Sequence, residues 1–372
     1  MSTYRINSSS ELQNTIQQSA VVTLRGGGSK SALQSHAVPN AAELDLRGLS
    51  GILEYEPGEF TFTALAGTPL ATVAATLAEH GQYLPFDPPF IEQGATLGGT
   101  VAAGLSGSGR YRFGGVRDFL IGVRFVDGLG RLVRGGGKVV KNAAGFDLPK
   151  LMVGSLGQFG VLTEVSFKVF PRPEAYTTLQ ASFTALVEAL AALQTVVDSH
   201  FDIHALDLQV EQQNGQAPMY RLWIRLGGLR AVLPQRVNQL RQLIVGGEAL
   251  PEQEEAAFWS TVNEGGWAAT EATLVKVALT PGKIRDIETT LAAHGAQRHY
   301  AVGGNLAWIA WPGDLAALDQ QLQTLGLTGL PLRGNSPHVY LGQRNGQHFA
   351  RRIKAALDPQ NRLPNYIESS NT

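Results

Sequence analysis

A strand-like run that leads into three consecutive glycines is the strongest candidate for chemistry in this sequence. Val21–Leu24 predicts a strand, and the residues that follow read R-G-G-G-S-K, namely Arg25, Gly26, Gly27, Gly28, Ser29 and Lys30. Consecutive glycine amides can point into one concavity and hold phosphate oxygens, and a serine hydroxyl adds a donor. A flexible turn is the alternative interpretation of such a triplet. The chain carries neither G-x-G-x-x-G after a strand nor G-x-x-x-x-G-K-[ST], so no Rossmann or Walker site is predicted.

A longer glycine-rich stretch carries an excess of positive charge, and its glycines would let the backbone approach a ligand closely. Residues 95–170 contain 17 of the 43 glycines, and their ten Lys and Arg exceed their four Asp and Glu by six, in a chain of net charge -1. Backbone without side chains and an excess of cations suit an anionic ligand. The alternative is a glycine-rich region of strands and turns with a solvated basic surface. Its recurrent motifs are T-L-G-G-T-V-A at 96–102, K-N-A-A-G-F-D-L-P-K-L at 141–151 and G-S-L-G-Q-F-G-V-L-T-E at 154–164.

Composition excludes several classes of protein. The 372 residues contain no cysteine, which excludes disulfides, cysteine-held iron–sulfur clusters and a flavin–cysteinyl bond within this chain. The near-neutral charge predicts no nucleic-acid partner. The N-terminus has no apolar core of a secretory signal, and no apolar run reaches the ~18 residues of a membrane span. We therefore expect a cytoplasmic protein, with any membrane association made through partners.

The elements that must position these motifs fall into three predicted parts. Residues 1–172 read as short strands and turns, and Pro171-Arg172-Pro173 is a plausible boundary. Residues 173–345 contain all five tryptophans and two successive βαββα patterns, which predict two ferredoxin-like halves in one α+β domain. Residues 346–372 form a C-terminal segment, with a helix over His348–Leu357, that returns to the first part.

The order of the motifs resembles the FAD domain of the vanillyl-alcohol-oxidase family, also described as the PCMH type. R-G-G-G-S-K, then E-P-G at 56–58, T-L-G-G-T-V-A and the run at 141–164 follow one another as in that family, and A-L-D-P at 356–359 is similar to its closing motif. The fold class that the resemblance implies is α+β: a two-part FAD-binding domain followed by a ferredoxin-like second domain. Within the family, the E-type subunits of bacterial glycolate oxidases show the strongest resemblance.

The resemblance assigns roles to individual residues. Gly26 to Lys30 would supply main-chain and hydroxyl donors to the FAD pyrophosphate, and the other implied cofactor-binding residues are Arg25, Gly58, Thr96, Gly98, Gly99, Asn142, Asp147, Gly157, Gly160 and Val161. Asn142 and Asp147 also fit ordinary turn or cap residues. The first glycine loop has no histidine, so we expect non-covalent FAD. No metal site is predicted, because the pair His200 and His204 favours a surface turn over a metal ligand set.

The implied activity is that of an FAD-dependent oxidoreductase working within a complex. The resemblance implies a catalytic FAD subunit and an iron–sulfur subunit as partners, and glycolate, oxidised to glyoxylate by the complex, as the small-molecule substrate. An electron-transfer or structural role is favoured, because catalytic relatives carry a late H-x-x-G-D-G-N type motif and the nearest fragment in this chain is Trp311-Pro312-Gly313-Asp314. A self-sufficient FAD-dependent 2-hydroxy-acid or alcohol oxidoreductase and a non-enzymatic scaffold are the alternatives, and no catalytic residue is predicted.

Overall fold

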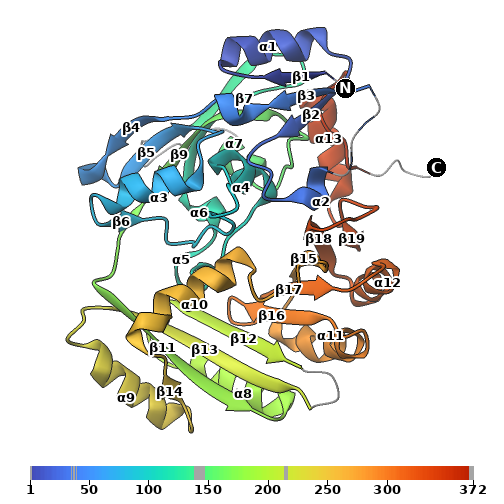
Figure 1. The fold of residues 1–372 in the computed structure, drawn as a ribbon. Coiled ribbons are helices and arrows are strands. Elements are labelled where there is room, and N and C mark those ends of the chain that lie inside the picture. The colour runs from blue at the N-terminus through green and yellow to red at the C-terminus, as the bar shows by residue number, and fades with distance from the viewer. Residues whose placement is uncertain are drawn as a thin grey trace.

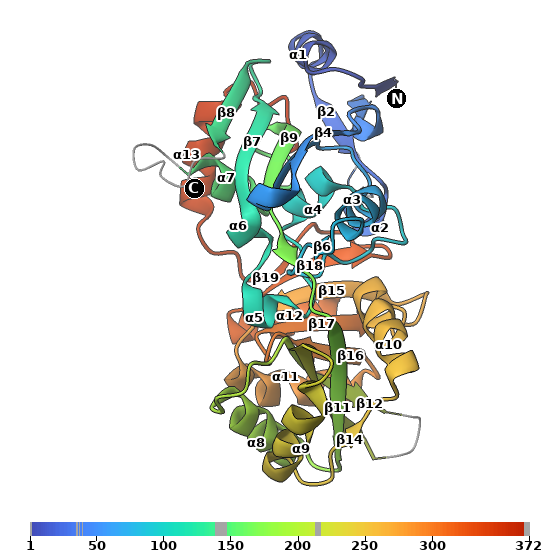
Figure 2. The same cartoon turned by 90° about the vertical axis from the view of Figure 1, so that its left-hand side faces the viewer.

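The computed structural model describes residues 2–34, 36, 38, 40–137, 147–212 and 217–367. Figures 1 and 2 show two stacked parts: the N-terminal part of the chain, through Val161–Lys168, together with the C-terminal helix, and a broad sheet below them. Helices and sheets are both present in the two parts, which confirms the α+β class that the sequence predicts.

The first part contains two sheets that face each other across a set of short helices. One is parallel, with the order β1-β3-β2, and the other is antiparallel, with the order β4-β5-β9-β7-β8. A two-stranded pair, β6 and β10, closes this part where the chain leaves it. The strands are β1 (Thr3–Arg5), β2 (Val22–Arg25), β3 (Ala42–Asp45), β4 (Ile52–Glu56), β5 (Thr61–Leu65), β6 (Gln82–Tyr83), β7 (Leu120–Val126), β8 (Leu132–Gly136), β9 (Val161–Lys168) and β10 (Phe170–Pro171).

Most helices of this part are short, because glycines and turns interrupt the chain. The longest is α1, whose N-cap Ser8 accepts a hydrogen bond from the backbone of Glu11 and whose Leu12 and Ile16 are buried. The helices are α1 (Ser9–Gln18), α2 (Ser31–Gln34), η1 (Leu46–Gly48), η2 (Pro57–Glu59), α3 (Leu70–Ala78), α4 (Leu97–Ala103), α5 (Arg110–Phe113), α6 (Val116–Phe119) and α7 (Leu148–Met152).

The second part is a nine-stranded antiparallel sheet with the order β14-β11-β13-β12-β16-β17-β15-β18-β19. Two units with the ferredoxin-like strand order lie side by side in it and meet where β12 pairs with β16. The strands are β11 (Ala175–Phe183), β12 (Ala205–Glu211), β13 (Met219–Gly228), β14 (Glu248–Ala249), β15 (Thr273–Ala278), β16 (Gln297–Ala301), β17 (Leu306–Trp311), β18 (Thr328–Arg333) and β19 (Leu341–Gly342).

The two faces of this sheet have different chemistry. One face is covered by helices and packs an apolar core that includes Leu193, Leu240, Ile284 and Leu322. The opposite face lies against the first part of the molecule and shares a second core with it. The helices are α8 (Leu186–Val197), α9 (Leu233–Leu243), α10 (Glu252–Glu264), α11 (Pro281–Ala293), α12 (Ala316–Leu325) and α13 (Gln347–Leu357), of which α13 returns to the first part (Figure 1).

Candidate functional site

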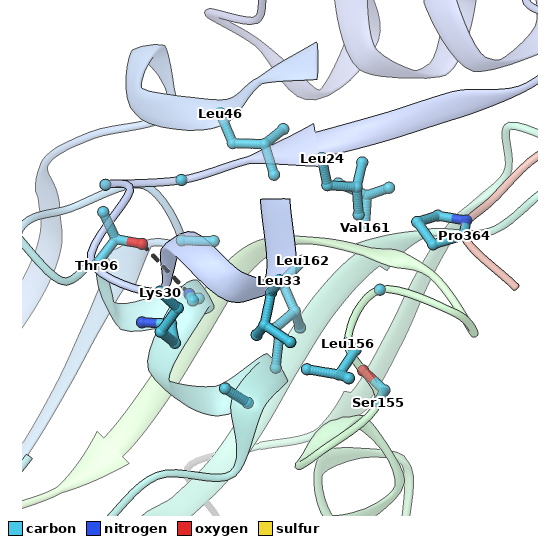
Figure 3. A pocket seen from close by; sticks show the side chains of 18 of the residues that line it. Leu24, Lys30, Leu33, Leu46, Thr96, Ser155, Leu156, Val161, Leu162 and Pro364 are labelled. Atoms are coloured by element: carbon cyan, nitrogen blue, oxygen red, sulfur yellow. Dashed lines mark hydrogen bonds between the residues drawn. The ribbon is translucent and has the colours of Figure 1, made fainter. Parts of the chain in front are cut away.

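A cavity opens between the parallel sheet, α4 and the start of β9. The space inside it, including the solvent-filled mouth, is about 960 Å³. Figure 3 shows Thr96 and Lys30 at one end and Ser155 and Pro364 at the other, with leucine side chains between them. Polar groups at its ends and apolar side chains between them suit a ligand that has both polar and aromatic parts.

The glycine loop after β2 forms one wall with its backbone. Among the described residues, none accepts a hydrogen bond from the backbone N–H groups of Gly26 to Lys30. Gly27 cannot carry a side chain here, because an added Cβ would lie 1.7 Å from the carbonyl oxygen of Gly94, and Gly28 adopts a φ of +81°. The loop therefore presents a row of unused donors to the cavity, as an anion-binding nest does.

The start of α4 forms the adjacent wall. Thr96 caps this helix, since its hydroxyl accepts a hydrogen bond from the backbone of Gly99 at 3.3 Å. Gly98 packs against the chain at Ala66, where a Cβ on Gly98 would lie 2.7 Å from the Cβ of Ala66. Both glycines of the T-L-G-G-T-V-A motif line the cavity, so the motif lets the helix approach the ligand space closely.

The far wall comes from the loop that precedes β9. A Cβ on Gly157 would lie 2.3 Å from a methyl carbon of Leu24, and one on Gly160 would lie 2.3 Å from the ring of Phe125. Ser155 lies in the same wall, and its buried hydroxyl has no hydrogen-bond partner among the described residues. Such a hydroxyl is costly to bury unless a ligand or water completes its hydrogen bond.

The electrostatics of the cavity favour an anion. No Asp or Glu is among its described lining residues, whereas the amine of Lys30 lies in its wall and donates to the hydroxyl of Ser29 at 2.9 Å. Burial lowers the pKa of Lys30 to about 8, because a charged amine is disfavoured away from water and has no carboxylate beside it in the described part of the chain. Unused amides, an unpaired cation and an orphaned hydroxyl are therefore gathered around one space.

Eleven of the fifteen residues that the sequence predicts to bind the cofactor lie together in this cavity. The lining set includes Gly26, Gly27, Gly28, Ser29, Lys30, Thr96, Gly98, Gly99, Gly157, Gly160 and Val161. Arg25 points away from it to Glu43 at 3.6 Å. Gly58 is exposed in η2, Asp147 caps α7 and pairs with Lys150 at 2.9 Å, and Asn142 lies outside the described residues.

The C-terminal segment supplies two lining residues that the sequence reasoning missed, Pro364 and Tyr366. Lys354 anchors this segment, since its buried amine donates to the carbonyl oxygens of Gln158, Leu363 and Pro364. The A-L-D-P motif was the available signal, because its Asp358 pairs with Lys354 at 2.7 Å and accepts hydrogen bonds from the turn that follows. The predicted return of the segment thus has a specific chemical basis.

Two histidines, His204 and His299, are buried. The surface turn predicted for His204 is wrong, because the side chain is buried against the rings of Phe113 and Tyr176. Burial lowers its pKa to about 3. The sequence reasoning gave no role to His299, which lies in the sheet and pairs with Asp207 at 2.7 Å. The available signal was H-Y-A-V-G-G-N at 299–305, where the histidine stands six residues before Asn305, as in the H-x-x-G-D-G-N type motif. Within the described part of the chain, no group of three or more His, Cys, Asp or Glu could hold a metal ion.

Comparison with known proteins matches the same region of the chain. Residues 4–136 match the FAD binding domain family model. The sequence is 38% identical over 254 residues to the glycolate oxidase subunit GlcE of Escherichia coli, covering 68% of this chain and 67% of that protein. The chain belongs to the family of the glycolate oxidase subunit GlcE.

More distant relatives share the fold. The chain is 32% identical to the glycolate oxidase subunit GlcD of Bacillus subtilis over 47% of its own length and 36% of that protein. It is 30% identical to a D-2-hydroxyglutarate dehydrogenase of Xanthomonas citri, over 67% of its own length and 52% of that protein. A solved structure of alkyldihydroxyacetonephosphate synthase superposes with a TM-score of 0.72 at 17% identity, covering 96% of this chain and 76% of that one.

This family membership identifies the cofactor as FAD and the chain as an FAD-dependent oxidoreductase. The residues present fit that cofactor, because an unpaired row of amides and Lys30 match a pyrophosphate, and the apolar lining beyond them matches aromatic rings. Within the described residues, no helix combines the length and apolar character needed to cross a bilayer.

Proposed function

We propose that this chain is the FAD-binding subunit of a complex that oxidises glycolate to glyoxylate, with an electron-transfer or structural role beside a catalytic flavin subunit and an iron–sulfur subunit. The observation that carries the proposal is the 38% identity to GlcE, joined to a cavity whose walls fit FAD. Two of the relatives, GlcE and GlcD, are themselves subunits of glycolate oxidase, which supports an assembly of several chains.

Different walls of the cavity have different roles in holding the cofactor. Gly26 to Lys30 hold the pyrophosphate through main-chain amides, the hydroxyl of Ser29 and the amine of Lys30. Gly98 and Gly99 keep α4 close to the cofactor, and Gly157, Gly160 and Val161 shape the opposite wall. When bound, FAD supplies a two-electron acceptor. The protein's part is to hold it, exclude water from it and leave one edge open.

An auxiliary role is supported by what lines the cavity. Oxidation of a 2-hydroxy acid needs a group that removes the hydroxyl proton and a cation or metal that holds the carboxylate. The described lining residues include no His, Asp or Glu, and Lys30 is the charged side chain among them. A self-sufficient 2-hydroxy-acid oxidoreductase is the second candidate. It is favoured by Arg225, His299 and Lys276, basic residues on the face of the nine-stranded sheet that lies against the first part. The scaffold alternative is disfavoured, since a chain without FAD has no need of the unused amides.

The domain organisation belongs to the same proposal. Residues 1–172 and 346–372 form the cofactor domain and residues 173–345 the second domain, a division supported by sheets that do not exchange strands between these ranges in the described part of the chain. Cytoplasmic location, with any membrane association made through partner subunits, completes it.

The decisive experiment measures reduction of the bound flavin by glycolate under anaerobic conditions. The FAD-loaded chain alone is expected to keep its visible absorption band, and addition of the two partner subunits should bleach the flavins and release glyoxylate. Bleaching of the isolated chain at the ~1–1,000 per second of ordinary enzymes would establish the self-sufficient enzyme instead. An assembled complex whose turnover is unchanged when this chain is omitted would contradict both.

The mode of FAD attachment is tested separately. The sequence has no cysteine and no histidine lies in the glycine loop, so the cofactor should be held without a covalent bond. Precipitation with acid is expected to leave yellow flavin in the supernatant. Flavin that stays in the washed pellet would show a covalent link.

A further inference from the structure

The face of the nine-stranded sheet that lies against the cofactor domain carries several basic groups. Arg225 on β13 pairs with Glu255 at 2.8 Å, and His299 on β16 pairs with Asp207 at 2.7 Å. Lys276 lies on β15 in the same row as His299, because each is directly opposite Trp308 on β17. Opposite residues of neighbouring antiparallel strands share a face, so these three basic groups all face the cofactor domain.

Lys276 differs from the other two in having no counter-charge. Among the described residues, no carboxylate lies within ion-pairing distance of its amine. The amine donates a hydrogen bond to the carbonyl oxygen of Gly104 at 2.9 Å. An ammonium group has three N–H donors, so two of them have no partner among the described residues. Gly104 directly follows Ala103, which lines the FAD cavity, and the amine therefore lies beside this part of the lining.

A second cation, Arg110, acts electrostatically on this amine. Burial lowers the pKa of Lys276 to about 8, and the positive charge of Arg110 acts in the same direction. Arg110 begins α5 and has no ion-pair partner among the described residues. Two neighbouring cations without a carboxylate repel each other, and a bound anion would remove that repulsion.

Capping of α4 is the simpler explanation for Lys276, since lysines often bind the last carbonyl groups of a helix. The packing of Lys354 argues that this is not the whole role. Lys354 is also buried, and it is satisfied by three carbonyl oxygens and by Asp358. This chain thus surrounds a purely structural lysine with acceptors, whereas Lys276 has a single carbonyl partner among the described residues.

We propose that Lys276 and Arg110 form a binding site for the carboxylate of a small 2-hydroxy acid, at the junction between the nine-stranded sheet and the part of the FAD cavity that Ala103 lines. The inference rests on the proposed function for its substrate class. It makes this chain itself a carboxylate-binding subunit, and it places recognition on residues from both parts of the molecule.

The test is binding of oxalate, a dicarboxylate that cannot be oxidised in the same way, to the FAD-loaded chain. Titration calorimetry and perturbation of the flavin spectrum report binding without turnover. Lys276→Met should weaken oxalate binding by about 10-fold or more, as expected for loss of a charge-assisted hydrogen bond, and Lys276→Arg should restore most of it. The matched control is Lys283→Met, which removes an exposed lysine of α11 and should change nothing.

Each outcome bears on the inference. Unchanged oxalate binding in Lys276→Met, or no carboxylate binding by the wild-type holoprotein, overturns it. Equal binding of glycolate and its uncharged amide, glycolamide, overturns it as well. If Lys276→Met does not fold, Arg110→Met replaces it, because that side chain is exposed, and must weaken oxalate at least about threefold. Turnover of glycolate by the assembled complex tests the proposed function independently, so the two can fail separately.

Discussion

Lys30 lies in the wall of the cavity and Lys354 anchors the segment that carries the lining residue Pro364, and the surroundings of the two amines differ. The amine of Lys30 has a single partner among the described residues, Ser29, in a loop whose amides are unused. The amine of Lys354 has three carbonyl partners and the carboxylate of Asp358, which itself receives two backbone hydrogen bonds. Burial lowers the pKa of both amines.

The difference distinguishes a ligand site from a structural anchor. Around Lys354 every strong polar group has a partner within the protein, so its contribution is to the stability of the fold. Around Lys30 the backbone donors have no acceptor in the described part of the protein. Buried donors without partners are costly, and a cofactor that provides phosphate oxygens recovers that cost. Substitutions of the two lysines should therefore separate stability from cofactor affinity.

The largest effect is expected at the anchor. Lys354→Met leaves Asp358 buried without its cation, and breaking a buried pair in this way costs ~3–5 kcal/mol. Chemical denaturation of the apoprotein should show this loss in its free energy of unfolding. Lys168→Met, at an exposed lysine on β9, is the control and should be neutral. A loss below ~1 kcal/mol would mean that Lys354 is not an anchor.

Prediction from sequence succeeded where the signal is local. The helix over His348–Leu357 was expected and α13 spans Gln347–Leu357, because its apolar residues recur with helical spacing and A-L-D-P ends it. The two ferredoxin-like units were also expected from alternating patterns, although β14 and β18, the fourth strand of each unit, were not. A two-residue strand and a strand containing proline carry little periodicity.

The same limit applies to the cavity. Its glycine walls could be named from motifs, because close approach of backbone needs glycine at fixed positions. Pro364 and Tyr366 could not, since their place depends on a lysine amine that gathers carbonyl groups from distant segments. Lys276 gave no sequence signal either, because its lack of a counter-charge is a property of the folded neighbourhood.

The second-largest effect tests whether FAD binding needs the close backbone approach of Gly27 or is lost at any glycine replaced by alanine. Gly27→Ala places a Cβ 1.7 Å from the carbonyl oxygen of Gly94, so the loop must move, and overpacking of this kind costs ~1–3 kcal/mol. We expect FAD affinity to fall by ~10–100-fold, measured by flavin fluorescence on titration of the apoprotein. Gly58→Ala is the matched control, because no atom of the described residues lies within 4 Å of the added Cβ. Equal losses in the two variants would also support a cofactor role for Gly58.

The smallest effect is the pH dependence of FAD affinity, and its sign follows from Lys30. The amine has a pKa of about 8 in the apoprotein, and a phosphate beside it would favour the charged form and raise that pKa. Binding therefore takes up a proton above pH ~8. Affinity should be constant below that pH and fall, by at most about tenfold per pH unit, as the pH rises through the interval between the two pKa values.

The variant Lys30→Met assigns this dependence to a residue. It should weaken FAD by about 10-fold at pH ~7, as loss of one charge-assisted hydrogen bond does, and remove the decline above pH ~8. Lys354→Met, in its folded fraction, should keep the decline, because its amine is bound to carbonyl groups and Asp358. If the decline persists in Lys30→Met, another group titrates with the cofactor, and the contrast between an unsatisfied and a satisfied lysine no longer explains where FAD binds.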